Sequence, residues 1–200
     1  AFGLRSLAKA GANLIKNAAQ RVPRLTEGLL GRQEAALREL LRKFREGKLD
    51  EALRRALPLG DMSDRGLGKA YGGTQLPFHN LIYSLSNLLG NVGGGAGGAW
   101  YGGYDVQAEL MREYRKAAEQ ALANGDFRRA AYIYGKLLRD YRQAANVLQR
   151  GGLFHDASIL YLTKVGDELS AARAFEAGGE LDRALQLYRD KGEHEMAGDL

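Results

Sequence analysis

Basic and aromatic side chains recur at helical spacing between residues 128 and 142. They form a stripe of Arg128, Tyr132, Lys136 and Arg139, flanked by Arg129 and Arg142. Arginine and tyrosine are favoured at the centres of protein interfaces, and clustered arginines bind acidic motifs. A stripe of this kind could therefore receive an acidic peptide, with Tyr132 as an exposed anchor beside the cations. The alternative is a solvated outer helix face, which we favour, although Tyr132 keeps the peptide site open.

No group of residues has the spacing of a catalytic, metal or nucleotide site. Residues 93–98 match the spacing of a dinucleotide-binding glycine motif, but that motif needs a strand before it and a helix after it. The residues that follow, 99–103, begin a helix poorly. His79, His155 and His194 lie far apart without ligand-like spacing, and the chain has no cysteine. We therefore expect a non-enzymatic protein with no cofactor and no metal. We expect His155 to lie at a helix start within a repeat, as a turn residue and not a metal ligand.

The stripe lies within a phrase that recurs from residue 125 to residue 200. The phrase is a glycine, four residues, an alanine, and often a large apolar residue four positions later. The glycine should end one helix and reverse the chain, while the alanine should let two helix axes approach closely. The glycines are Gly125, Gly152, Gly166, Gly179 and Gly192, and residues 140–150 carry a version without the glycine. The repeating pairs are Ala130 with Tyr134, Ala144 with Leu148, Ala157 with Tyr161, Ala171 with Phe175, and Ala184 with Tyr188.

Each period of the phrase is long enough for one short helix and a tight turn. From Ala130 to Ala197 the alanine spacings are 14, 13, 14, 13 and 13 residues. Two periods therefore make one helical hairpin. Because a single hairpin cannot bury its apolar face alone, the hairpins must stack.

The residues from Gly125 to Tyr134 resemble the second-helix signature of tetratricopeptide repeats. That signature is a glycine, an acid, an aromatic residue, two variable residues, an alanine and then a tyrosine. The resemblance covers roughly residues 30–57 and 106–200, and it departs from the family in its period, which is about 34 residues there and 27 residues from Gly125 to Gly152 here. It implies an all-α solenoid of short helical hairpins, similar to those in coat and trafficking scaffolds. It also implies protein–protein binding and carries over no catalytic residue.

Four segments are predicted along the chain. Residues 1–24 form a basic amphipathic helix, and residues 25–57 form a first helical unit that carries the phrase from Gly47. Residues 58–105 form a glycine-rich insertion with one helix. Residues 106–200 form the tetratricopeptide-like helices, which we expect to continue beyond the last residue given.

The insertion combines dense glycine with large side chains. Eight glycines lie between residues 90 and 103, and such density costs backbone order. The apolar residues at helical spacing, which predict the one helix, are Phe78, Leu81, Ile82, Leu85, Leu88 and Leu89. The aromatic residues Trp100, Tyr101 and Tyr104 should pack against a surface. We expect the insertion to lie on the solenoid and these three aromatics to contact a partner.

Positive charge is concentrated in the N-terminal third. The net charge is +5, but residues 1–60 hold 13 Lys and Arg against 6 Asp and Glu, while residues 106–200 hold 14 against 15. The cations of the first helix are Arg5, Lys9, Lys16, Arg21 and Arg24. They could contact an anionic surface, a membrane or a nucleic acid. We favour the alternative of a terminal helix packed on its own domain, and we do not expect nucleic-acid binding by the near-neutral remainder.

These observations predict a binding scaffold or a subunit of a larger assembly. Its contacts with a protein partner would use the helical-repeat surface and the 58–105 insertion, in a homo- or hetero-oligomer. The alternative function is attachment to a membrane surface or a nucleic acid through residues 1–24. The absence of cysteine and of any apolar run of about 18 residues predicts a cytoplasmic protein, peripheral to a membrane if the basic helix binds lipid.

Overall fold

A computed structural model describes residues 28, 31–59, 75–76, 78–90 and 104–198 of the chain. Every regular element in these residues is helical, which confirms the predicted all-α class. The predictions for residues 1–24, Trp100 and Tyr101 fall outside the described residues. None of the helices in the described part of the chain has both the length and the apolar character needed to cross a bilayer.

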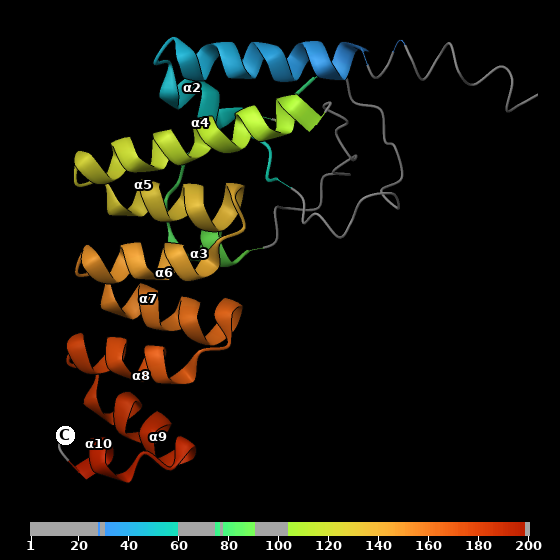
Figure 1. The fold of residues 1–200 in the computed structure, drawn as a ribbon. Coiled ribbons are helices and arrows are strands. Elements are labelled where there is room, and N and C mark those ends of the chain that lie inside the picture. Colours follow the sequence, from blue (N-terminus) through green and yellow to red (C-terminus); the bar gives the residue numbers. More distant parts are fainter. Residues whose placement is uncertain (1–27, 29–30, 60–74, 77, 91–103, 199–200) are drawn as a thin grey trace, which may run out of the picture.

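The helices of the C-terminal half form a single row in which each packs on the next along the chain (Figure 1). The row consists of α4 (Tyr104–Ala123), α5 (Phe127–Tyr132), α6 (Tyr141–Arg150), α7 (Phe154–Leu160), α8 (Glu168–Ala177), α9 (Leu181–Lys191) and α10 (His194–Gly198). Two π-helical turns, η2 (Ile133–Leu137) and η3 (Tyr161–Val165), continue α5 and α7. The helix over residues 31–45 and α2 (Leu49–Arg54) share a core with α4, and the short α3 (Leu85–Leu89) packs beside α5 and α6.

Each glycine of the phrase stands at a chain reversal. Gly47, Gly125, Gly152, Gly166, Gly179 and Gly192 all have φ between 72° and 77°. This left-handed region is open to glycine and costly for other residues. The prediction that these glycines end helices is therefore confirmed. In the version without a glycine, Arg139 takes the same conformation, with φ 61°.

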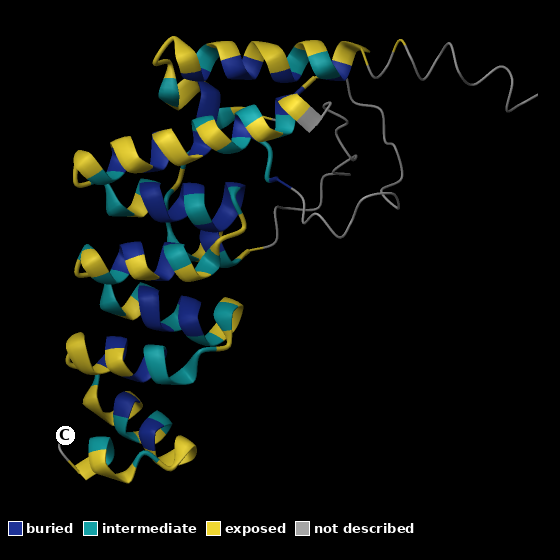
Figure 2. Ribbon diagram, in the orientation of Figure 1, coloured by how far each residue is buried: buried dark blue, intermediate teal, exposed yellow. Residues whose placement is uncertain are grey.

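The alanines of the phrase lie in the core between packed helices. Ala130, Ala144, Ala157, Ala171 and Ala184 are completely buried, and Figure 2 shows the buried faces turned toward neighbouring helices. Of the large residues that follow them, Leu148, Tyr161, Phe175 and Tyr188 are buried and Tyr134 is half-buried. The predicted role of the alanine in close helix packing is consistent with this burial.

The predicted helix in the insertion is much shorter than its apolar spacing suggested. It spans only Leu85–Leu89, and residues 78–84 are not helical. Ser84 has an extended backbone and its hydroxyl accepts a hydrogen bond from the backbone N–H of Asn87, at 3.3 Å. That contact is an N-cap, which starts a helix after Ser84. Upstream, the N–H of His79 donates to the carbonyl of Arg54 at 2.7 Å, so this backbone pairs with another element of the fold.

Candidate partner-binding surface

One side of α2, α5 and η2 is covered by residues 78–90 of the same chain, which we call the strap. Its main chain is attached through His79, whose N–H donates to Arg54 of α2. Its side chains are attached through Tyr83, whose ring meets the ring of Tyr132 edge-on, with centroids 5.4 Å apart. Arg129 Nε donates to the Tyr83 hydroxyl at 3.2 Å. Main-chain and side-chain contacts therefore both hold the strap on these helices.

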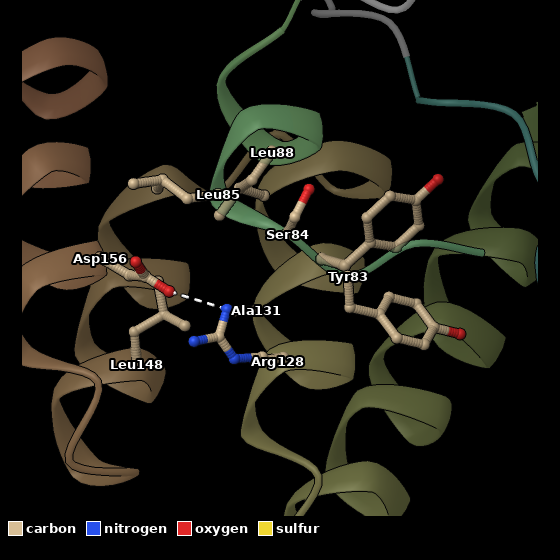
Figure 3. A pocket seen from close by; sticks show the side chains of 9 residues that line it. Tyr83, Ser84, Leu85, Leu88, Arg128, Ala131, Leu148 and Asp156 are labelled. Atoms are coloured by element: carbon tan, nitrogen blue, oxygen red, sulfur yellow. Dashed lines mark ion pairs between the residues drawn. The ribbon is translucent and has the colours of Figure 1, made fainter. Parts of the chain in front are cut away.

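The middle of the strap packs tightly against three helices. In Figure 3, Tyr83, Ser84, Leu85 and Leu88 of the strap lie over residues of α5, α6 and α7. The hollow between them has a volume of about 10 Å³, which is the room of one water molecule at most. Leu88 is buried at 4% exposure and contacts the backbone of η2 at Gly135. The middle of the strap is thus part of the core and leaves no room for a ligand there.

Tyr132 and Lys136 are buried, which corrects the predicted exposed stripe. Tyr132 is 9% exposed and Lys136 is 8% exposed. Both point at the strap, which lies more than 40 positions earlier in the chain, and the strap covers them. The tyrosine that we expected to be an exposed anchor for a partner instead anchors a segment of its own chain.

Most arginines of the predicted stripe are already paired with acids of this chain. Arg128 lies 3.0 Å from Asp156, a contact drawn in Figure 3. The other pairs are Arg129 with Asp50 at 2.6 Å and Asp126 at 3.3 Å, and Arg142 with Asp167 at 2.6 Å. Arg139 is exposed and its guanidinium donates to the Tyr141 hydroxyl at 3.4 Å. The stripe therefore does not present a continuous row of unpaired cations.

These ion pairs link helices that are separated in sequence. Arg142 on α6 reaches Asp167, which also caps α8 by accepting from the N–H of Ser170 at 3.0 Å. The Ser170 N–H, followed by Arg142, lowers the pKa of Asp167 below its ordinary value. Exposed pairs contribute only about 0–1 kcal/mol each. Here they connect α5 with α7 and α6 with the start of α8.

A groove lies beside the strap, between it, η2 and the segment that follows α2, which contributes Ala56 and Pro58. Its volume is about 350 Å³, and its lining includes Phe78, His79, Ile82, Asn87, Lys136 and Leu137. Phe78 and Ile82 are 64% and 57% exposed. The groove thus has apolar walls at its rim and polar groups in its floor.

The floor of the groove carries a buried positive charge. Lys136 Nζ donates to the carbonyl of Asn87 at 2.7 Å and also to that of Gly90. Burial, together with Arg139 and Lys164, lowers the pKa of Lys136. Burial and the charge of Lys136 in turn lower the pKa of His79, so the imidazole is neutral near pH 7. At that pH the ammonium is the charged group of the floor.

The remaining predicted contact residues have side chains outside the described part of the structure. Tyr104 is the first residue of α4, and its side chain is outside the described part of the structure. The same is true of Trp100, Tyr101 and the basic residues of the N-terminal segment, Arg5, Lys9, Lys16, Arg21 and Arg24. His155 lies at a helix start, as expected, although it is inside the helix and not in the turn before it. It is the second residue of α7, and its Nδ1 lies 2.8 Å from Glu180 Oε1.

Sequence reasoning missed the groove because it treated residues 78–89 as one helix. A helix over that range would place Phe78 and Ile82 on its buried face. The available signal was Ser84, since serine is a strong N-cap and would have moved the helix start to residue 85. Among the residues that the structure describes, no three His, Asp or Glu side chains are placed to hold a metal ion.

Comparison with protein-family models, with curated proteins and with solved structures gives no match for this chain. Its function is therefore inferred from the geometry of its own surface.

Proposed function

We propose that this chain is a non-catalytic protein-interaction scaffold, built as a tetratricopeptide-like solenoid of short helical hairpins. The regular spacing of the left-handed turns and the fully buried alanines support such a repeat. So does the packing of each helix on the next. Repeats of this kind expose long surfaces whose shape is set by the stacking of helices, and such surfaces suit partner binding.

The observation that carries this proposal is the strap itself. It lies on α2, α5 and η2 in a mostly non-helical conformation, held by one main-chain bond to Arg54 and by side chains of Arg129, Tyr132 and Lys136. A surface that holds an extended segment of its own chain has the chemistry needed to hold an extended segment of another protein. Of the candidate residues chosen from sequence, Arg129, Tyr132 and Lys136 hold the strap, and this supports a role for them in recognition.

The scaffold function is tested by reconstituting a complex from two purified proteins. The tagged full chain is crosslinked in a lysate of its source cells, and each crosslinked protein is then purified and mixed with the purified chain. We expect at least one of them to form a stoichiometric complex in size-exclusion chromatography with light scattering. If every purified candidate elutes separately from the chain, the proposed scaffold function is wrong.

A further inference from the structure

Two large apolar side chains stand exposed at the rim of one groove. In the described part of the chain, the exposed large hydrophobics are Phe78, Ile82 and Leu181. The first two line the same groove, whereas Leu181 belongs to α9 at the other end of the row. A single exposed apolar side chain is ordinary, but two together on a concave surface are typical of an interaction site.

The charge in the floor of this groove has no anionic partner in the described part of the chain. Lys136 forms no ion pair there, and the groove lining includes neither Asp nor Glu. An ammonium has three N–H donors, and those of Lys136 bond two carbonyl oxygens. Carbonyl oxygens solvate the ammonium, and no carboxylate in the described part of the chain neutralises its charge.

A second cation lies close to the rim. The guanidinium of Arg54 is 5.7 Å from the centre of the Phe78 ring. Arg54 does not line the groove itself, so Lys136 is the cation that a carboxylate in the groove would meet. Burial weakens the ionised form of Lys136, and a carboxylate beside it would reverse that effect, because an opposite charge stabilises a charged group.

The groove has room for a short peptide segment. Its volume of about 350 Å³ is at the small end of the range for ligand pockets, about 300–1,000 Å³. The apolar rim and the positive floor are adjacent, so one occupant can satisfy both only if it carries an apolar group next to an anion.

We propose that the groove beside the strap binds an extended segment of a partner protein that carries an acidic residue close to a large apolar residue. The carboxylate pairs with Lys136 in the floor, and the apolar side chain packs between Phe78 and Ile82. This assignment rests on the scaffold function and names the chemistry of the partner.

The probes are short fluorescein-labelled peptides in a Gly-Ser background. Each carries one Asp or Glu within three positions of one Leu or Phe, and each has a matched peptide with Asn or Gln in place of the acid. Binding to the full chain is followed by fluorescence anisotropy. We expect the best acidic peptide to bind at least about tenfold more tightly than its amide match, since an unpaired buried charge discriminates strongly. Its affinity should fall as salt is raised.

Three variants of the full chain locate the binding. Ile82→Glu places a carboxylate at the rim and should lower the affinity for the acidic peptide at least about tenfold. This variant should fold because Ile82 is exposed. Leu181→Glu is the matched control, an exposed apolar residue on α9, and should bind as the wild type does. Lys136→Met keeps the aliphatic stem and should remove the preference for acid over amide.

Several results would overturn the assignment. Equal binding of acidic and amide peptides would show that no carboxylate is recognised. Loss of binding in Leu181→Glu but not in Ile82→Glu would place the site elsewhere. Carboxyl-directed crosslinks from Lys136 to this chain or to a second copy of it would show a different occupant. If no peptide binds although a stoichiometric protein complex forms, the groove assignment is wrong and the scaffold function stands.

Discussion

Replacement of Arg139 by glycine should stabilise this protein. Arg139 is the one non-glycine residue with positive φ in the described part of the chain, with φ 61°. It stands between η2 and α6, 27 positions before Gly166, which has φ 72°. The reference variant is Arg139→Ala, which removes the guanidinium but keeps the β-carbon that makes this conformation costly. The difference in free energy of unfolding between the glycine and alanine variants therefore reports the backbone effect alone.

The expected gain follows from two opposing effects. The left-handed conformation costs a residue with a β-carbon about 1–2 kcal/mol, and glycine avoids that cost. Glycine also gives the unfolded chain more freedom, which costs about 0.4–1 kcal/mol. We therefore expect Arg139→Gly to exceed Arg139→Ala in free energy of unfolding by about 0.5–1 kcal/mol. The hydrogen bond from Arg139 to Tyr141 is long, 3.4 Å, and exposed, and its loss is common to both variants.

The reverse substitution at the equivalent turn provides the control. A β-carbon added at Gly166 would meet no atom within 4 Å, so Gly166→Ala should cost a similar amount through backbone strain alone. Urea unfolding followed by circular dichroism measures the stability differences at positions 139 and 166. With an m-value of about 2 kcal/mol/M, a difference of about 0.5–1 kcal/mol shifts the urea midpoint by about 0.25–0.5 M. If Gly166→Ala is destabilising while Arg139→Gly is no more stable than Arg139→Ala, the strain assigned to Arg139 is wrong. If Gly166→Ala is as stable as the wild type and Arg139→Gly is only as stable as Arg139→Ala, positive φ does not explain why the phrase has glycine at these turns.

Three further predictions concern the packing and capping of the helices. The buried Tyr114 hydroxyl donates to the carbonyl of Leu57 at 3.0 Å and accepts from its N–H at 3.2 Å, so Tyr114→Phe should lower the free energy of unfolding by about 1–3 kcal/mol; an unchanged urea midpoint would contradict this. Ala184 is fully buried, and Ala184→Leu should cost about 1–3 kcal/mol through overpacking, whereas the exposed control Ala177→Leu should change the thermal midpoint little. Asp167 has a lowered pKa in the folded chain. Its contribution to the free energy of unfolding is therefore complete above the unfolded pKa of about 3.9, and this contribution is lost as pH falls through the folded pKa. Asp167→Ala should therefore cost about 1 kcal/mol at pH 7, and urea curves at falling pH should show this difference shrinking below pH about 4; a pH-independent difference would refute the charged-cap account.

The helices and turns of the C-terminal half were predictable because their determinants are local. A glycine, an acid and an alanine at fixed offsets specify a turn, a cap and a close contact within one period of the phrase. Gly125, Asp126 and Ala130 show all three, with a φ of 74°, a side-chain bond to the Arg129 N–H and complete burial. The same logic extended back to Gly47, which lies in the turn before α2 with φ 74°, and to Ala52, which is completely buried in α2.

The candidate binding surface was predicted only in part, because the exposure of its residues depends on a distant segment. Helical spacing placed Arg129, Tyr132 and Lys136 close together, and the structure does so. Helical spacing could not show that the strap would cover Tyr132 and Lys136, since contacts between residues more than 40 positions apart leave no periodic pattern in the sequence. Nor could it show that Arg128 and Arg142 would pair with acids about 25 positions away.

The sequence by itself therefore determined the helical class, the places where the chain reverses and the small residues at the helix contacts. These depend on backbone sterics and on side-chain volume within a few turns of helix. Only the tertiary structure decided which cations are free, which tyrosine is buried and where an apolar rim meets a positive floor. Those properties depend on which segments exclude water from one another. For Lys136 that segment is the strap, which also carries the exposed Phe78 and Ile82.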